Sequence, residues 1–326
     1  MKYTIYPESF HSIYSFWEKS LPALRWNSIF VLPSWLKVWW RQFGADSVLY
    51  LCSVRQSENI IGIAPLSVTG KKAAFIGSTD VCDYLDFVVT PGKEEYFFTA
   101  LIEHLKAQGI SYLDLRTVRP DSTVCTHLVG VARRRGADVS LAPEDVTLEL
   151  DLPAGWDEYL RSLNGKQRHE IRRKIRRLRE AGDIDYRVVQ DTETVKQEMD
   201  TFLALFRLNR SNKAEFMTDR MGLFFRSFAA AMAETNILRL CFLDFDSRPV
   251  AALICFDYNS TICLYNSAYD SRFSSLSVGV LSKVLSIKDS IQNGRKKYDF
   301  LKGDEAYKHR LGGSEVPLYR CRIKLK

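Results

Sequence analysis

A strand, a short polar turn and a second strand follow one another twice in the chain, once in each half. The first pattern is SVLYLCSV, RQSE and NIIGIAPLSV, and the second is contained in LRLCFLDFDSRPVAALICFDY, residues 238–258. The opening LRLC of the second pattern matches LYLC at Leu49–Cys52. Short apolar runs bounded by turn residues predict β-hairpins. A duplicated α/β domain explains the repetition, and a chance likeness of two apolar hairpins is the alternative.

The remaining segments extend each hairpin into a mixed α/β unit. The first half also contains helix patterns at PSWLKVWWRQFG and at about Gly92 to Ala107. In the second half a third strand, TICLYNSAYD, precedes a helix with one apolar stripe, SVGVLSKVLSIKDSIQNG. At 326 residues the chain is long enough for two domains. Turn residues near Leu141 to Pro153 mark a boundary, so we expect tandem domains at residues 1–150 and 151–326, each a mixed sheet flanked by helices.

Cysteine, histidine and hydropathy patterns exclude several classes of protein. The seven cysteines form an odd number without a CxxC pair and mostly lie in apolar strands, as reduced core thiols do. The five scattered histidines show no HExxH or other ligand spacing, so no metal is expected. The N-terminus lacks the apolar region of a secretory signal, and the longest clean apolar run, Val250–Phe256, is far shorter than the roughly 20 residues of a membrane-spanning helix. We therefore expect a cytoplasmic protein without a membrane span.

The net charge of +7 is concentrated in one helix pattern. Residues 156–182 carry nine Lys/Arg against four Asp/Glu. Leucines and isoleucines at positions 160, 163, 171, 175 and 178 can form a buried stripe that leaves the arginines on a solvated face. A surface for nucleic acid or another polyanion is the alternative. The scarcity of interleaved aromatic residues argues against sequence-specific recognition of RNA.

The turn RFSSLSVG, Arg272–Gly279, lies between a predicted strand and a predicted helix. The unpaired N–H groups and the dipole at a helix start bind anions, including a pyrophosphate. Serine hydroxyls and a glycine at this position fit such a role. N-capping of the helix by serine is the simpler explanation.

The segment YDFLKGDEAYKHRLGG, Tyr298–Gly313, combines acids, cations, an imidazole and glycines. Asp299 follows a strand, and the next glycine permits a sharp turn, after which Glu305, Tyr307 and Lys308 could return to the same cleft. An acid and an ammonium placed there could deprotonate an amine nucleophile or stabilise charge in an acyl-transfer intermediate. As a loop residue, Lys308 is expected to contribute little to the core. Exposed loop charges without a chemical role are the alternative.

Three motifs together resemble a known family. They are YDFLKGDEAYK, the preceding strand with the S-x-G opening of its helix, and the early PSWLKVWWRQFG. These motifs resemble GNAT-superfamily acyltransferases of the CelD-like or BioF-like type, which are relatives of the FemAB peptidyltransferases. The resemblance covers most of residues 33–326 and is sharpest over 265–311. It implies two tandem GNAT domains, the C-terminal one being the acyltransferase domain.

The resemblance also implies a site. The pair Tyr307 and Lys308 is similar to the aromatic–lysine pair that FemAB-type enzymes place beside the acyl donor, and Asp299 and Glu305 complete the expected catalytic set. We expect the Lys308 ammonium to lie near the start of the helix SVGVLSKVLSIKDSIQNG, at the end of the turn Arg272–Gly279. That helix start corresponds to the segment where GNAT proteins cradle the pyrophosphate of acyl-CoA. Its expected donor-binding residues are Ser275, Ser277, Val278, Gly279 and Lys283.

The loop of this chain, R-F-S-S-L-S-V-G, departs from the Q/R-x-x-G-x-G/A pattern that is usual in GNAT proteins. The expected donor is therefore either acyl-CoA or an acyl-carrier-protein thioester. The implied function is transfer of an acyl group to a small-molecule amine in envelope, polysaccharide or amino-acid-derivative biosynthesis, with the first domain shaping the acceptor cleft. Two alternatives stay open. A FemAB-like transferase would use aminoacyl-tRNA, with Arg168 to Arg179 contacting phosphates. A non-catalytic GNAT-like module would only bind a polyanion or a protein partner.

Overall fold

Both hairpins expected from the sequence are present in the computed structural model. The first pairs β2 (Val48–Gln56) antiparallel with β3 (Asn59–Thr69). The second pairs β9 (Leu238–Phe245) antiparallel with β10 (Arg248–Tyr258). Each hairpin lies inside a mixed α/β unit, so the fold class predicted from the sequence is confirmed.

The chain divides into two compact units. The N-terminal unit comprises Met1–Val146 together with Val316–Lys326, and the C-terminal unit comprises Thr147–Glu315. The boundary expected at residue 150 therefore lies close to the observed one, inside β7 (Asp138–Asp151). The last residues, expected in the second domain, belong instead to the N-terminal unit. The structure describes residues 3–19, 24–208 and 216–325.

Strand pairing explains why the end of the chain joins the N-terminal unit. The last strand, β13 (Ser314–Lys324), pairs antiparallel with β6 (Tyr112–Val118). Cys321 and Ile323 of β13 are fully buried there. An alternating strand buries its apolar face against whichever sheet offers a free edge, and the sequence pattern does not say which sheet that is.

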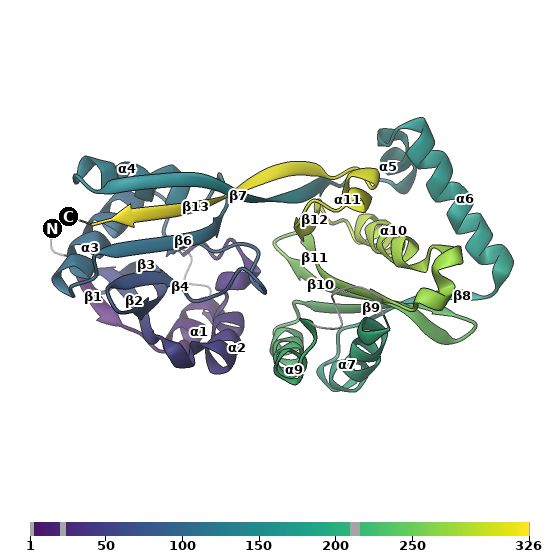
Figure 1. Cartoon of the computed structure of the whole chain (residues 1–326), viewed down its shortest axis with the longest axis horizontal. Coiled ribbons are helices and arrows are strands. Elements are labelled where there is room, and N and C mark those ends of the chain that lie inside the picture. The colour runs from purple at the N-terminus through teal and green to yellow at the C-terminus, as the bar shows by residue number, and fades with distance from the viewer. Residues whose placement is uncertain (1–2, 20–23, 209–215, 326) are drawn as a thin grey trace. The chain divides into compact units, whose positions relative to one another are not determined.

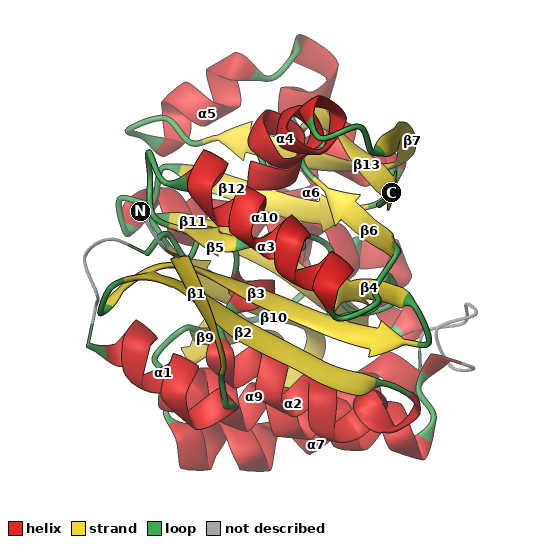
Figure 2. Cartoon of the chain, turned by 90° about the vertical axis from the view of Figure 1, so that its left-hand side faces the viewer, coloured by secondary structure: helices red, strands yellow, loops and turns green. Residues whose placement is uncertain are grey.

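The sheet of the N-terminal unit has the strand order β1-β2-β3-β4-β6-β13-β7, with β5 paired to β3. In Figure 2 helix α3 passes in front of these strands, and α1 and α2 lie below them. The bounds not yet given are β1 (Tyr3–Pro7), α1 (Phe10–Glu18), η1 (Ile29–Val31), α2 (Pro33–Phe43), η2 (Gly44–Asp46), β4 (Lys72–Phe75), β5 (Val88–Val89), α3 (Glu94–Ala107), η3 (Val124–Leu128) and α4 (Val129–Arg134).

The sheet of the C-terminal unit has the strand order β7-β12-β11-β10-β9-β8. Helices α7 and α9 cover one face, and α10 covers the other (Figure 1). The bounds not yet given are α5 (Trp156–Ser162), α6 (Gly165–Ala181), β8 (Ile184–Val189), α7 (Thr192–Arg207), α9 (Asp219–Glu234), β11 (Thr261–Tyr269), η4 (Ser271–Leu276), α10 (Val278–Gln292), β12 (Lys297–Lys302) and α11 (Ala306–Arg310).

The basic segment predicted as one helix is two helices, α5 and α6. The break occurs at Asn164, whose side chain accepts a hydrogen bond from the backbone N–H of Gln167 at 2.9 Å. The Gln167 side chain accepts one from the backbone N–H of Asn164 at 3.1 Å. This reciprocal capping box satisfies the first N–H groups of α6 and ends α5 before it. The apolar stripe expected along the segment is present, with Leu160, Ile171 and Leu178 buried.

The cysteines and the helices agree with two further expectations. All seven cysteines are free thiols, six of them buried and Cys125 half-buried. Burial raises the pKa of the Cys52 thiol to about 12, as an apolar core does. Within the part of the chain that the structure describes, every helix is too short or too polar to cross a bilayer.

An aromatic cluster forms the core between the sheet of the C-terminal unit and its helices. Phe228 of α9 is fully buried and lies 5.3 Å from Tyr265 of β11 and 5.0 Å from Phe225, measured between ring centroids. The cluster holds β11 against α7 and α9, and β11 leads directly to the turn before α10.

Replacing Phe228 tests this packing. We expect Phe228→Ala to lower the free energy of unfolding by about 3–5 kcal/mol, because it removes a buried ring and leaves a cavity. Urea denaturation followed by circular dichroism measures the change. Leu223→Ala on the same helix is the matched control, since Leu223 is 58% exposed and its truncation should cost less than about 0.5 kcal/mol. Equal losses for both variants would contradict the assignment of the core.

Candidate functional site

Strands β11 and β12 of the C-terminal unit run parallel and then separate. Their register covers three pairs, Thr261–Cys263 against Lys297–Asp299. On its other side β11 pairs with β10 across a register shift at Ile254/Cys255. The neighbouring β12 shifts register against β7 between Asp299 and Lys302. Strand ends that separate in this way leave backbone groups and side chains available between them.

Asp299 holds the bend in β12. Its side chain is buried, and Oδ1 accepts a hydrogen bond from the backbone N–H of Leu301 at 2.8 Å and from the Thr147 hydroxyl at 3.3 Å. Leu301 has a φ of 59°, in the left-handed region that non-glycine residues seldom occupy. The carboxylate predicted as catalytic therefore braces the backbone at the point where β12 leaves the ladder.

The Lys308 ammonium is enclosed by backbone. Nζ donates to the carbonyl oxygens of Leu301, Lys302 and Gly303 at 2.9, 2.7 and 2.9 Å. It also lies 2.8 Å from Oε2 of Glu305, whose side chain is exposed. The residue is 1% exposed. The expectation of a loop lysine that contributes little to the core is wrong, because the sequence does not show that three carbonyls converge on this side chain.

Tyr307 and Lys283 join the two segments that the sequence singled out. The Lys283 ammonium lies 4.9 Å from the centroid of the Tyr307 ring. It also donates to the Gly279 carbonyl at 2.7 Å, one turn back along α10. The ammonium at the start of α10 thus belongs to Lys283, which is buried, whereas the Lys308 ammonium contacts the β12–α11 turn. A cation on an aromatic face is favourable where water is excluded.

The start of α10 lacks a side-chain cap. Ser277 precedes the helix with a φ of 61° and makes no side-chain capping hydrogen bond, so the alternative of plain serine capping does not apply. The N–H groups of Val278 and Gly279 lie in the first turn of α10, where an α-helix offers its N–H groups no partner of its own. A Cβ on Gly279 would lie 2.8 Å from Cδ1 of Tyr269, so the helix start is pressed against β11. Ser275 is exposed within η4.

The Tyr307 phenol is electrostatically set to keep its proton. Burial raises its pKa well above the ordinary value, and the neighbouring Glu305 charge raises it further. The ring lies 6.4 Å from Phe300 in an edge-on arrangement. A phenol in this state is a hydrogen-bond donor at neutral pH.

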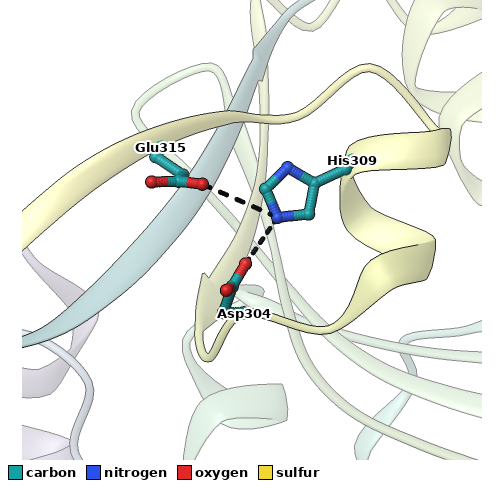
Figure 3. A group of neighbouring side chains, drawn as sticks. All are labelled: Asp304, His309 and Glu315. Atoms are coloured by element: carbon teal, nitrogen blue, oxygen red, sulfur yellow. Dashed lines mark hydrogen bonds and ion pairs between the residues drawn. The ribbon is translucent and has the colours of Figure 1, made fainter.

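A second group of polar side chains, Asp304, His309 and Glu315, converges near α11 (Figure 3). His309 Nε2 lies 2.5 Å from Asp304 Oδ1 and 3.8 Å from Glu315 Oε1. One imidazole and two carboxylates can hold a divalent cation. The hydrogen bond between His309 and Asp304 accounts for the grouping without an ion. Search of the sequence for local ligand spacings missed this group because its members come from a loop, a helix and a strand.

His309 points away from the candidate site. On an α-helix, residues two apart differ by about 200° around the axis, so His309 and Tyr307 lie on opposite sides of α11. The site therefore consists of Tyr307, Lys283 and the start of α10, with Lys308 and Asp299 shaping the turn that carries Tyr307.

Comparison with known proteins shows which fold the chain has. Residues 165–309 match the family model described as acetyltransferase (GNAT) domain. The chain has the fold of tandem GNAT-like proteins. Searching curated proteins gives no match.

Solved structures with the same fold cover both units. FemX superposes with a TM-score of 0.67 at 12% sequence identity, over 98% of this chain and 97% of that chain. A conserved protein from Bacteroides thetaiotaomicron gives 0.63 at 13% identity, over 100% of each chain. A tandem GNAT protein from the clavulanic acid biosynthesis pathway gives 0.50 at 12% identity, over 98% of each chain. At these identities the likeness concerns the GNAT-like fold and not the substrates.

Lys308 provides a test of the turn. We expect Lys308→Met to lower the free energy of unfolding by about 3 kcal/mol, because three buried carbonyls lose their donor. Lys308→Arg should recover little of this loss, since a planar guanidinium does not reproduce three converging contacts. Arg310→Met, at an exposed position of the same helix, is the control. Unchanged stability of Lys308→Met with lost turnover would instead show that the ammonium acts in catalysis.

Proposed function

We propose that the C-terminal unit transfers an acyl group from a thioester, acyl-CoA or an acyl-carrier-protein thioester, to an amine. The observation that carries this proposal is that the Lys283 ammonium contacts both the Tyr307 ring and the Gly279 carbonyl at the start of α10. The helix α10 connects β11 and β12, which separate after three residue pairs. The GNAT-domain match covers these same segments. Within the GNAT-like fold, the motifs from Tyr298 to Gly313 favour the CelD-like or BioF-like type.

The start of α10 would hold the phosphate end of the donor. The N–H groups of Val278 and Gly279 point out of the helix, and the helix dipole adds partial positive charge there. Lys283 adds a buried ammonium one turn along. Gly279 lets this helix start pack directly against the Tyr269 ring of β11, which would fix its position. Ser275 and Ser277 offer hydroxyls at the entrance. These groups fit a pyrophosphate or a phosphopantetheine phosphate.

Tyr307 would serve as the general acid. In the reaction the amine nitrogen attacks the thioester carbonyl carbon, the C–S bond breaks, and the amine loses a proton to solvent. The leaving sulfur needs a proton, and a phenol whose pKa is raised by burial holds one. The Lys283 ammonium, 4.9 Å from the ring, adds positive charge beside the developing thiolate. Amines of envelope, polysaccharide or amino-acid-derived acceptors fit this chemistry.

The decisive measurement is free-thiol release by the purified chain with acyl-CoA and acyl-carrier-protein thioesters and a panel of amines. Tyr307→Phe should lower kcat about a hundredfold, because proton transfer to the leaving group is lost. Since burial raises the pKa of Tyr307, the wild-type rate should show no decline between pH 7 and about pH 9 from loss of this proton. Tyr96→Phe, at a 48%-exposed position of the N-terminal unit, is the control.

Gly279 tests the donor site separately from the chemistry. A methyl group at Gly279 would lie 2.8 Å from Tyr269, so Gly279→Ala should displace the start of α10 and raise KM for the thioester about tenfold or more, with a smaller effect on kcat. Gly165→Ala is the matched control, because nothing lies within 4 Å of its added Cβ. Turnover that is insensitive to both Tyr307→Phe and Gly279→Ala would exclude this site. Absence of turnover with every thioester would favour the aminoacyl-tRNA donor or a non-catalytic binding module.

A further inference from the structure

A cavity of the C-terminal unit lies between α5, α6 and α10 and has a volume of about 450 Å³. Figure 1 shows these three helices together on one side of the unit. The apolar part of the lining comes from all three helices: Trp156 and Leu160 from α5, Ile175 from α6 and Leu285 from α10. Cavities of about 300–1,000 Å³ with apolar walls are typical of small-molecule sites.

Cations dominate the polar lining of this cavity. They are Arg172, Arg176, Arg179 and Lys288. Two acids, Asp157 and Glu180, also line it, and the shortest contact among these charged groups joins Arg176 to Glu180 at 3.7 Å.

Two cations of α6 outside the cavity have an acidic partner. Arg173 forms an ion pair of 2.9 Å with Glu170, and Lys174 lies 3.4 Å from the same carboxylate. In contrast, no ion pair of the described residues involves Arg172, Arg179 or Lys288. Like charges held together repel one another, and the two acids of the lining leave an excess of two positive charges among its four cations. An anionic ligand in the cavity would relieve this repulsion.

We infer that this cavity binds a small soluble ligand in which phosphate groups are attached to a flat apolar body, the chemistry of a nucleoside diphosphate. Arg172 and Arg179 would contact the phosphates, since guanidinium groups bind phosphate with paired hydrogen bonds. Trp156, which lies 5.1 Å from the Tyr159 ring, would contact the base. The concave apolar floor distinguishes this site from a flat basic surface for RNA, which would use the outer side of α6 equally.

This ligand site is separate from the proposed acyl-transfer site and does not depend on that function. Both touch α10, but Val278 begins the helix and Lys288 lies about 15 Å farther along it at 1.5 Å per residue. Lys288 and Leu285 line the cavity, whereas Gly279 and Lys283 belong to the acyl-transfer site.

Isothermal titration of the whole chain with ADP, UDP and inorganic pyrophosphate tests the inference. One equivalent of nucleotide should bind. Arg172→Ala with Arg179→Ala should weaken that binding about a hundredfold, because each lost charge-assisted contact weakens binding about tenfold. Trp156→Ala should weaken ADP and UDP but leave pyrophosphate binding unchanged. Binding at the donor site would persist in the Arg172→Ala, Arg179→Ala variant, so only the binding that this variant loses is assigned to the cavity.

A matched control is available on the same helix. Lys166→Ala with Arg177→Ala also removes two positive charges, but at exposed positions outside the cavity, and should leave nucleotide binding unchanged. If the two double variants weaken nucleotide binding equally, the ligand binds a general polyanion surface and not the cavity. The same conclusion follows if a single-stranded RNA oligonucleotide binds more tightly than either nucleotide and both double variants weaken its binding equally. Absence of nucleotide binding at low salt would overturn the inference outright.

Discussion

The buried ammonium of Lys308 determines how β12 leaves the sheet and how α11 begins. A buried charge is tolerated only where its hydrogen bonds are satisfied. Here the carbonyls of three successive residues, 301–303, turn toward one atom. That convergence requires the chain to bend, and the positive φ of Leu301 with its Asp299 hydrogen bond provides the bend. Because Tyr307 precedes Lys308 on the short helix, fixing the lysine also fixes the direction of the phenol.

The candidate site follows from this bend and from the separation of two strands. Parallel strands β11 and β12 are joined through α10, so the start of that helix must lie at the end of β11 where the strands part. Gly279 allows the helix start to approach Tyr269 closely. Lys283 then bridges from this helix to Tyr307. Two segments that are separate in sequence thus bring together an ammonium, a protonated phenol and the first-turn N–H groups of α10.

Local patterns predicted what local sequence determines. Apolar periodicity gave both hairpins and α10, and Gly303, with a φ of 107°, does permit the turn that its residue type suggested. Long-range convergence was not predictable in this way. The sequence contained no signal that Lys308 would meet carbonyls rather than a ligand, or that His309 would meet Asp304 and Glu315. The pairing of β13 with the N-terminal unit could not be predicted either, because an alternating strand fits more than one sheet edge.

The two units have a similar order of elements but differ in the charge at the start of one corresponding helix. In the N-terminal unit the hairpin is followed by β4, α3 and β6, and β4 pairs parallel with β6 as β11 does with β12. Yet α3 begins with Glu94 and Glu95, whereas the first turn of α10 contains no acid. Carboxylates at a helix start compensate the partial positive charge of the helix dipole and repel phosphate. The start of α10 therefore has the electrostatics that the proposed phosphate-bearing donor would require, and the start of α3 does not.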